Sequence, residues 1–178
     1  MDLICDLIRD VEDFPEPGIV FKDITPLLSD PDAFETAIEA MAAPWLNAEP
    51  GNEITKVAGI ESRGFVFGVP IAQRISVGFV PIRKEGKLPF DSIAQSYLRE
   101  YGPDTIEIHT DAVGVGDRVL IVDDVLATAG TALAAATLIG AAGATVAGFS
   151  VLIELGSLAP RSLLADFTVE SVVVFGGD

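Results

Sequence analysis

Five short runs rich in valine and isoleucine recur along this chain, and they constrain its fold more than any other feature. The runs occupy residues 56–60, 77–82, 118–122, 144–153 and 169–175. Helical patterns over residues 64–75 and 130–142 fall between them. Apolar runs that alternate with helices are typical of a parallel sheet buried on both faces. The sequence therefore predicts an α/β fold, with a central, mainly parallel sheet of about five strands flanked by helices.

The first part of the chain lies outside this alternation. Residues 2–11 predict a short amphipathic helix, and residues 13–28, with three prolines and a glycine, predict an extended hook. Residues 31–46 predict a second helix, for which Ser29 or Asp30 is a plausible cap. We therefore expect an irregular N-terminal segment that leads into a regular helix.

A polar insertion, residues 83–112, lies between the second and third runs. It contains two alternating stretches, 92–98 and 105–109, which predict a long antiparallel hairpin that projects from the sheet as a lid. No internal repeat or low-complexity linker divides the chain. We therefore expect one domain over residues 1–178, with residues 1–28 as an N-terminal hook.

The charge balance excludes several classes of partner. The chain carries 11 Lys and Arg against 27 Asp and Glu, a net charge of −16, and such a surface repels nucleic acids and anionic lipids. Cys5 is the only cysteine, so neither an intrachain disulfide nor a thiolate zinc cluster is expected. The N-terminus lacks a basic start before an apolar stretch, and no apolar run has membrane-spanning length. We expect a cytoplasmic protein that binds neither nucleic acid nor membranes.

The strongest chemical signal is the segment that follows the third run. Asp123 and Asp124 are followed by a loop of small residues, 127–131, and then by a helix. A helix start offers unpaired N–H groups and a positive dipole end, which suit a phosphate, and the carboxylates suit sugar hydroxyls. The pattern lacks both the nucleoside-triphosphate loop and the dinucleotide fingerprint. The residues alone are equally compatible with an acid pair that serves only as turn and helix cap.

The wider pattern resembles a known family. VLIVDDVLATAGT, residues 119–131, resembles the phosphoribosyl-pyrophosphate signature of the type I phosphoribosyltransferases. Four further segments resemble the members of this family that act on adenine: residues 14–28, 57–68, 79–89 and 96–113. This resemblance implies the type I phosphoribosyltransferase fold, with an N-terminal hood and a hairpin lid. It also implies transfer of the phosphoribosyl group from phosphoribosyl pyrophosphate to adenine, through an oxocarbenium-like transition state, to give AMP and pyrophosphate.

The resemblance also assigns binding roles. For the ribose and its phosphate, the implied residues are Asp123, Asp124, Ala127, Thr128, Ala129, Gly130 and Thr131. For pyrophosphate they are Glu61, Ser62, Arg63, Arg83, Lys84 and Lys87, with a cis peptide expected between Glu61 and Ser62. For adenine they are Val20, Phe21, Lys22 and Leu155.

Catalysis and assembly follow from the same resemblance. Glu100, on the lid, is the implied general base, with Arg63 as the second catalytic residue and Tyr101 beside the site. Magnesium is expected to be held mainly by the pyrophosphate and ribose oxygens, without a dedicated protein cage. Members of the family are usually homodimers, so a homodimer is expected here.

Three positions depart from the common family pattern, one of which is Phe90, an unusually apolar residue at the base of the lid. Ala129 stands where glycine is usual. If this residue needs a positive φ, alanine costs about 1–2 kcal/mol, whereas at the start of the helix the change is nearly neutral. Lys22 stands where arginine is frequent, so a backbone contact to the nucleotide is expected there.

Two other functions remain compatible with the residues. A transferase for hypoxanthine, guanine or xanthine would differ only in the hook and near Leu155. A non-catalytic regulator that binds phosphoribosyl pyrophosphate on the same fold would tend to lose the acid–base group and gain a basic surface. The presence of Glu100 and the acidic composition favour an enzyme.

Overall fold

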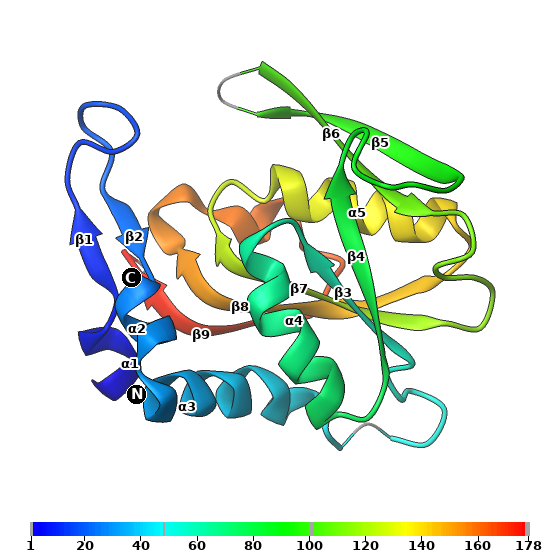
Figure 1. The fold of residues 1–178 in the computed structure, drawn as a ribbon, viewed down its shortest axis with the longest axis horizontal. Coiled ribbons are helices and arrows are strands. Elements are labelled where there is room, and N and C mark those ends of the chain that lie inside the picture. The colour runs from blue at the N-terminus through cyan, green and yellow to red at the C-terminus, as the bar shows by residue number, and fades with distance from the viewer. Residues whose placement is uncertain (1, 48, 100–101, 177–178) are drawn as a thin grey trace.

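The central sheet carries the five parallel strands that the apolar runs predict (Figure 1). The computed structural model describes residues 2–47, 49–99 and 102–176. The parallel strands are, in spatial order, β4 (Gly78–Lys84), β3 (Lys56–Ile60), β7 (Arg118–Leu126), β8 (Thr145–Leu155) and β9 (Val169–Phe175). The expected α/β architecture with a mainly parallel sheet is confirmed.

The hairpin of the polar insertion extends this sheet. Its strands, β5 (Ser92–Arg99) and β6 (Gly102–His109), are antiparallel, and β6 pairs with the end of β4. The pairing joins Arg83 to Glu107 and Lys84 to Ile106. In the described part of the chain the sheet therefore has seven strands, in the order β5-β6-β4-β3-β7-β8-β9, rather than about five. The expectation was too low because a pairing between distant segments leaves no local pattern.

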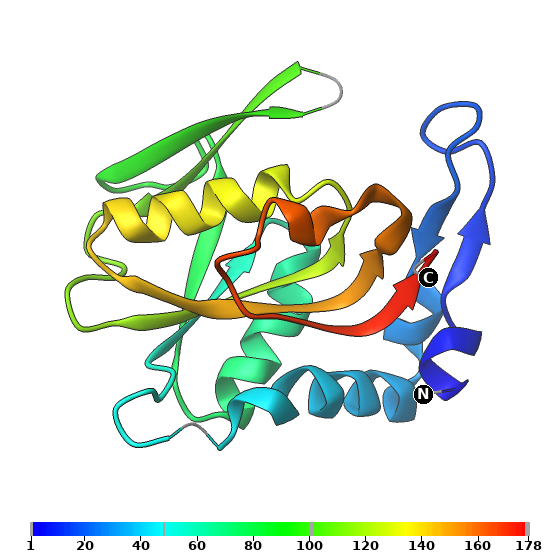
Figure 2. The ribbon, with the colours of Figure 1, turned by 180° about the vertical axis from the view of Figure 1, so that it is seen from behind.

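Helices cover both faces of the sheet (Figures 1 and 2). One face packs against α5 (Gly130–Ala141), and the other packs against α3 (Pro31–Ala42) and α4 (Arg63–Arg74). Within β7, Val119 and Ile121 enter the first core while Leu120 and Val122 enter the second. This alternation follows from the two-residue period of a strand. The continuous apolar run is thus explained by burial on both faces.

The remaining elements are short. Asp30 caps α3 by accepting a hydrogen bond from the Ala33 amide at 2.9 Å, as one of the two expected caps. The helix is followed by a 3-10 turn, η1 (Ala43–Trp45), and two more follow β8, η2 (Gly156–Leu158) and η3 (Pro160–Ser162). Among the described residues, no helix combines the length and apolarity that crossing a bilayer requires.

The N-terminal segment differs from the expected helix. It consists of α1 (Asp2–Asp6), β1 (Arg9–Val11), β2 (Phe21–Asp23) and α2 (Thr25–Ser29). The helix predicted over residues 2–11 is wrong in its second half, because β1 pairs with β2. Ion pairs of 2.6 Å, Arg9 to Asp23 and Lys22 to Asp10, tie the two strands together. Figure 1 shows this hook beside the ends of β8 and β9.

Acid is expected to loosen the hook through Asp23. The Thr25 amide first, and the Arg9 guanidinium second, lower the pKa of Asp23 from 3.8 to about 2. Because the folded pKa lies below the unfolded one, this stabilisation is complete above pH 3.8 and is lost as the pH falls through about 2. The protection of amide hydrogens in β1 and β2 relative to their intrinsic exchange should therefore fall over that window. In Asp23→Asn the acid dependence should be absent, and its persistence would contradict the assignment to Asp23.

Candidate active site

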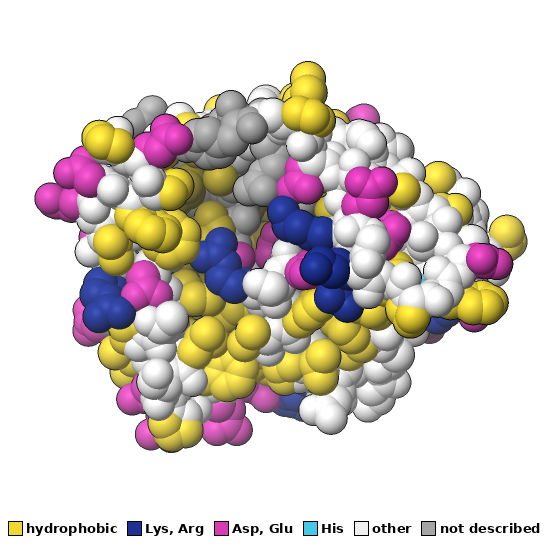
Figure 3. Space-filling view, turned by 45° about the horizontal axis from the view of Figure 1, so that its top comes forward, with side chains coloured by type: hydrophobic (Ala, Val, Ile, Leu, Met, Phe, Trp, Pro, Cys, Tyr) yellow, Lys and Arg dark blue, Asp and Glu magenta, His cyan; other side chains and the backbone are white. Residues whose placement is uncertain are grey.

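A cavity of about 430 Å³ opens at the carboxyl ends of β3, β7 and β8. Figure 3 shows a hollow in this face of the molecule, with basic side chains gathered at its rim. Ligand sites of open parallel sheets lie at this edge. The lining includes residues 19–22, 60–63 and 123–132, together with Lys84, Tyr97 and Leu155.

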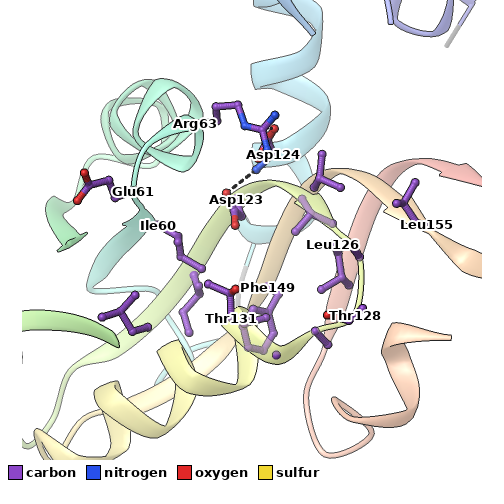
Figure 4. Close-up of a pocket in the computed structure, with 18 of the residues that line it drawn as sticks. Ile60, Glu61, Arg63, Asp123, Asp124, Leu126, Thr128, Thr131, Phe149 and Leu155 are labelled. Carbon is purple, nitrogen blue, oxygen red and sulfur yellow. Dashed lines mark hydrogen bonds and ion pairs between the residues drawn. The ribbon is translucent and has the colours of Figure 1, made fainter. Parts of the chain in front are cut away.

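Two adjacent carboxylates lie in the wall of this cavity (Figure 4). β7 continues to Leu126, so Asp123 and Asp124 stand on the strand rather than after it. The side chain of Asp124 is only 3% exposed, and its Oδ2 accepts no hydrogen bond from the described residues. A buried acceptor without a donor destabilises the fold unless a ligand or water bonds it. This oxygen therefore suits a hydroxyl group or a hydrated cation.

Arg63 reaches the acid pair from the first turn of α4. Its Nε lies 2.9 Å from Asp124 Oδ2, close enough for an ion pair, although its N–H does not point at that oxygen. The same guanidinium lies 5.2 Å from the centre of the Phe21 ring. Arg63 thus connects the acid pair with the side of the cavity that the hook forms.

Burial raises the pKa of both carboxyl groups. For Asp123, burial and then the charge of Asp124 hold the pKa well above its usual range. For Asp124, burial raises the pKa and the charge of Arg63 opposes that rise. A ligand that donates hydrogen bonds or brings positive charge favours the ionised forms. The pair is therefore suited to hydroxyls and to a cation.

The loop between β7 and α5 has the form of a phosphate site. Residues 127–131 all line the cavity, and α5 begins at Gly130 without a side-chain cap from the described residues. The N–H groups of its first turn are thus available to an anion. Ala129 precedes the helix and has φ 64°. Of the two conformations considered for this residue, the strained one with positive φ therefore occurs.

Replacing Ala129 by glycine is expected to stabilise the protein. Alanine in the left-handed region costs about 1–2 kcal/mol, and the extra freedom of glycine in the unfolded chain offsets about 0.4–1 kcal/mol of that gain. We expect Ala129→Gly to raise the free energy of unfolding in urea by about 0.5–1 kcal/mol. Ala142→Gly is a matched control that should be destabilised instead, because Ala142 has φ −77°. A loss of stability in Ala129→Gly would contradict the strain.

The expected pyrophosphate residues separate into two groups. Arg63 and Lys84 line the cavity, as do Glu61 and Ser62, whereas Arg83 and Lys87 are not part of the lining. The expected cis peptide between Glu61 and Ser62 is confirmed.

The Glu61 carboxylate faces cations of the chain. Its Oε2 accepts from Arg83 Nε and from the Lys84 amide, each at 2.8 Å. These hydrogen bonds, that of Arg83 foremost, lower the pKa of Glu61. An ionised carboxylate repels pyrophosphate, so the Glu61 side chain is placed to hold Arg83 and Lys84 rather than to bind an anion.

Two residues near these cations escaped the sequence analysis. Glu107 is 6% exposed, and its carboxylate accepts from the amides of Lys87 and Leu88 and from Ser92 Oγ at 3.0–3.3 Å. Tyr97 lines the cavity, and its hydroxyl accepts from Thr131 Oγ1 at 3.2 Å. No local signal marked Glu107, because Ile106-Glu107-Ile108 has the alternation that predicts an exposed glutamate, whereas all three residues are buried.

The hook and the end of β8 form the opposite wall. Val20, Phe21 and Lys22 line the cavity from the hook, and Leu155 lines it from β8. Lys22 Nζ bonds Asp10 and lies 4.0 Å from the centre of the Phe175 ring. This arrangement occupies the ammonium group of Lys22. The expected lid residues Glu100 and Tyr101 lie outside the described residues.

Comparisons with known proteins agree with this geometry. Residues 28–176 match the phosphoribosyl transferase domain. The chain is 57% identical to an adenine phosphoribosyltransferase of Thermobifida fusca over 96% of this chain and 94% of that protein. A crystal structure of the Rhodothermus marinus adenine phosphoribosyltransferase is 51% identical, with a TM-score of 0.90, and covers 98% of this chain and 97% of that one. The Saccharomyces cerevisiae enzyme, crystallised with an imino-altritol bisphosphate and adenine, is 36% identical, with a TM-score of 0.90, and covers 97% and 99%.

Proposed function

Since this chain belongs to the phosphoribosyltransferase family, among the adenine phosphoribosyltransferases, we propose that the cavity at the ends of β3, β7 and β8 is its active site. The chain is an enzyme that transfers the phosphoribosyl group of phosphoribosyl pyrophosphate to adenine, which yields AMP and pyrophosphate. The observation that carries the site is the buried Oδ2 of Asp124, which pairs with Arg63 but accepts no hydrogen bond from the described residues, beside the uncapped start of α5. A sugar phosphate supplies partners to both at once.

The sugar phosphate occupies the β7–α5 side of the cavity. The Asp123 and Asp124 carboxylates accept hydrogen bonds from the ribose hydroxyls. The first N–H groups of α5 and the hydroxyls of Thr128 and Thr131 hold the phosphate, with Ala127, Ala129 and Gly130 shaping the loop. This grip fixes the ribose carbon at which the bond to pyrophosphate breaks and the bond to adenine forms.

The leaving pyrophosphate meets the cations of the β3–α4 turn and of β4. Arg63 and Lys84 stabilise the negative charge that grows as the bond breaks, together with backbone N–H groups around Ser62. Glu61 positions Arg83 and Lys84, and Glu107 holds the backbone at Lys87. The loop from Arg83 to Lys87, which carries the cations, is therefore held by carboxylates on two sides.

Adenine lies between the hook and β8. Phe21 offers its ring for stacking, the backbone at Val20 and Lys22 reads the purine edge, and Leu155 closes the other side. Glu100 takes the proton that the attacking imidazole ring of adenine loses, and returns it in the reverse reaction.

The acid pair fits a magnesium ion that the substrate would bring. The unbonded Oδ2 of Asp124 and the raised pKa of Asp123 fit a hydrated cation that keeps its water, as Mg²⁺ does. Among the described residues, no group of three potential ligands from His, Cys, Asp and Glu gathers at one point. Held mainly by the pyrophosphate and ribose oxygens, such an ion would neutralise pyrophosphate charge, and the Asp123 and Asp124 carboxylates would hold its water.

The working unit is a homodimer of single-domain chains in the cytoplasm. Val66 and Val69, on α4, are 38% and 42% exposed and form an apolar strip next to Arg63. Burial of such side chains favours association. The partner would approach α4 and the loop from Arg83 to Lys87.

The test is an assay with each purine in turn. Purified chain, Mg²⁺ and phosphoribosyl pyrophosphate are mixed with adenine, hypoxanthine, guanine or xanthine, and the nucleotides are separated. AMP from adenine is expected, with little product from the other bases. Product from another base alone would support a different purine transferase, and binding without product would support a regulator.

A further inference from the structure

A row of hydrogen bonds connects the phosphate loop with the cation Lys84 through the lid hairpin. Thr131 Oγ1 donates to the Tyr97 hydroxyl at 3.2 Å, and that hydroxyl donates to Asp104 Oδ2 at 3.3 Å. Lys84 Nζ donates to the same Oδ2 at 2.8 Å. Tyr97 on β5 and Asp104 on β6 are opposite each other near the turn of the hairpin, so this half of the hairpin contacts both expected phosphate-binding regions.

Asp104 is held firmly in this row. Its other oxygen, Oδ1, accepts from the Thr105 amide at 2.9 Å, which fixes the orientation of the carboxylate. The side chain of Asp104 is 19% exposed and that of Lys84 is 45% exposed. Lys84 can therefore move toward a ligand in the cavity it lines, while Asp104 stays in place.

The position of Asp104 has an electrostatic consequence. An ammonium group has three donors, so Lys84 either leaves Asp104 for pyrophosphate or bonds both. In the first case the Asp104–Lys84 ion pair must break. In the second case two anions share one cation and repel each other. Both cases weaken the binding of pyrophosphate.

We propose that Asp104 limits the affinity of the cavity for the leaving group, pyrophosphate, so that this product is released. The inference rests on the proposed function, because it takes Lys84 as a pyrophosphate ligand. Tight binding of the product would not speed transfer and would slow each turnover, since only interactions stronger in the transition state accelerate the chemistry. Tyr97 contributes by holding Asp104 beside Lys84.

The sign of the effect separates this role from a structural one. Asp104→Asn keeps the size and an acceptor oxygen but removes the charge. The proposal expects pyrophosphate, titrated calorimetrically in excess Mg²⁺, to bind about three- to fivefold more tightly, as removal of a partly exposed ion-pair competitor would allow. The KM for adenine should not change. A merely structural Asp104, or one that held the magnesium ion, would give weaker binding instead.

Asp111→Asn is the matched control, because it removes the same charge from the chain just after β6. The five residue steps of β6 from Asp104 to His109 alone span about 16 Å, so Asp111 lies farther from Asp104 than the screening length of charges in salt solution. Asp104→Ser provides a second variant that also lacks the charge. In a Lys84→Met background, most of the effect of Asp104→Asn on pyrophosphate binding should disappear, because the cation for which the two anions compete is gone.

The outcomes divide cleanly. Unchanged or weaker pyrophosphate binding in both Asp104 variants overturns the proposal, as does equal tightening in Asp111→Asn. An Asp104→Asn effect that persists in full with Lys84→Met also overturns it. If the unmodified chain makes no AMP from adenine, the proposed function itself fails. If it makes AMP and Asp104→Asn does not tighten binding, only this inference fails.

Discussion

Replacing Arg63 by methionine is expected to lower kcat/KM for phosphoribosyl pyrophosphate by about two to three orders of magnitude. The guanidinium faces Asp124 and Phe21 within the cavity, where it lies between the sugar side and the base side. Its removal takes away a fixed positive charge from the region where the pyrophosphate charge develops. Steady-state kinetics with varied phosphoribosyl pyrophosphate measure the loss.

The same variant should alter the pH dependence of substrate binding. The charge of Arg63 opposes the burial that raises the pKa of Asp124, and it also lowers the pKa of Asp123. Without Arg63 both pKa values rise further, so the carboxylates ionise only at higher pH. The acid limb of kcat/KM for phosphoribosyl pyrophosphate should therefore move upward.

Two controls make the Arg63 result specific. Arg63→Lys keeps the charge without the planar fork, and an intermediate loss is expected. Arg74→Met removes a cation from the other end of α4, where Arg74 pairs with Glu39, about 16 Å along the helix. Activity of Arg63→Met equal to that of Arg74→Met would contradict the role of Arg63.

Gly64→Ala is expected to reduce both stability and turnover. A Cβ at Gly64 would lie 2.6 Å from the carbonyl oxygen of Val122 and 3.1 Å from Asp123 Oδ1. The carbonyl belongs to β7 and cannot yield without moving that strand, so overpacking should cost about 1–3 kcal/mol of unfolding free energy. A shift of Asp123 by about 1 Å should lower turnover by about 100-fold.

Gly140→Ala is the matched control for that substitution. Gly140 lies within α5, and a Cβ at this position would meet no atom within 4 Å beyond its own stretch of the helix. Alanine is there expected to stabilise the helix by up to about 1 kcal/mol. Urea unfolding and the adenine assay test both variants, and wild-type stability and turnover in Gly64→Ala would show that β7 tolerates the contact.

The local patterns predicted the regular elements well, for a physical reason. β3 and β9 have the bounds of their apolar runs, 56–60 and 169–175, and α5 begins at Gly130 as expected. Burial on both faces makes such strands continuously apolar, so a short window of sequence contains the signal. The end of β7 was placed too early because Asp123 and Asp124 are polar residues on a strand.

The sequence by itself determined the α/β class and the family, because periodicity and contiguous motifs carry these properties. Only the tertiary structure decided that residues 9–11 form a strand, that Glu61 faces Arg83, and that Asp104 faces Lys84. Each of these depends on two segments that are distant in the sequence and meet in space. The free energy of such a contact cannot be predicted from either segment alone. The positive φ of Ala129 has the same origin, since the turn from β7 into α5 imposes it.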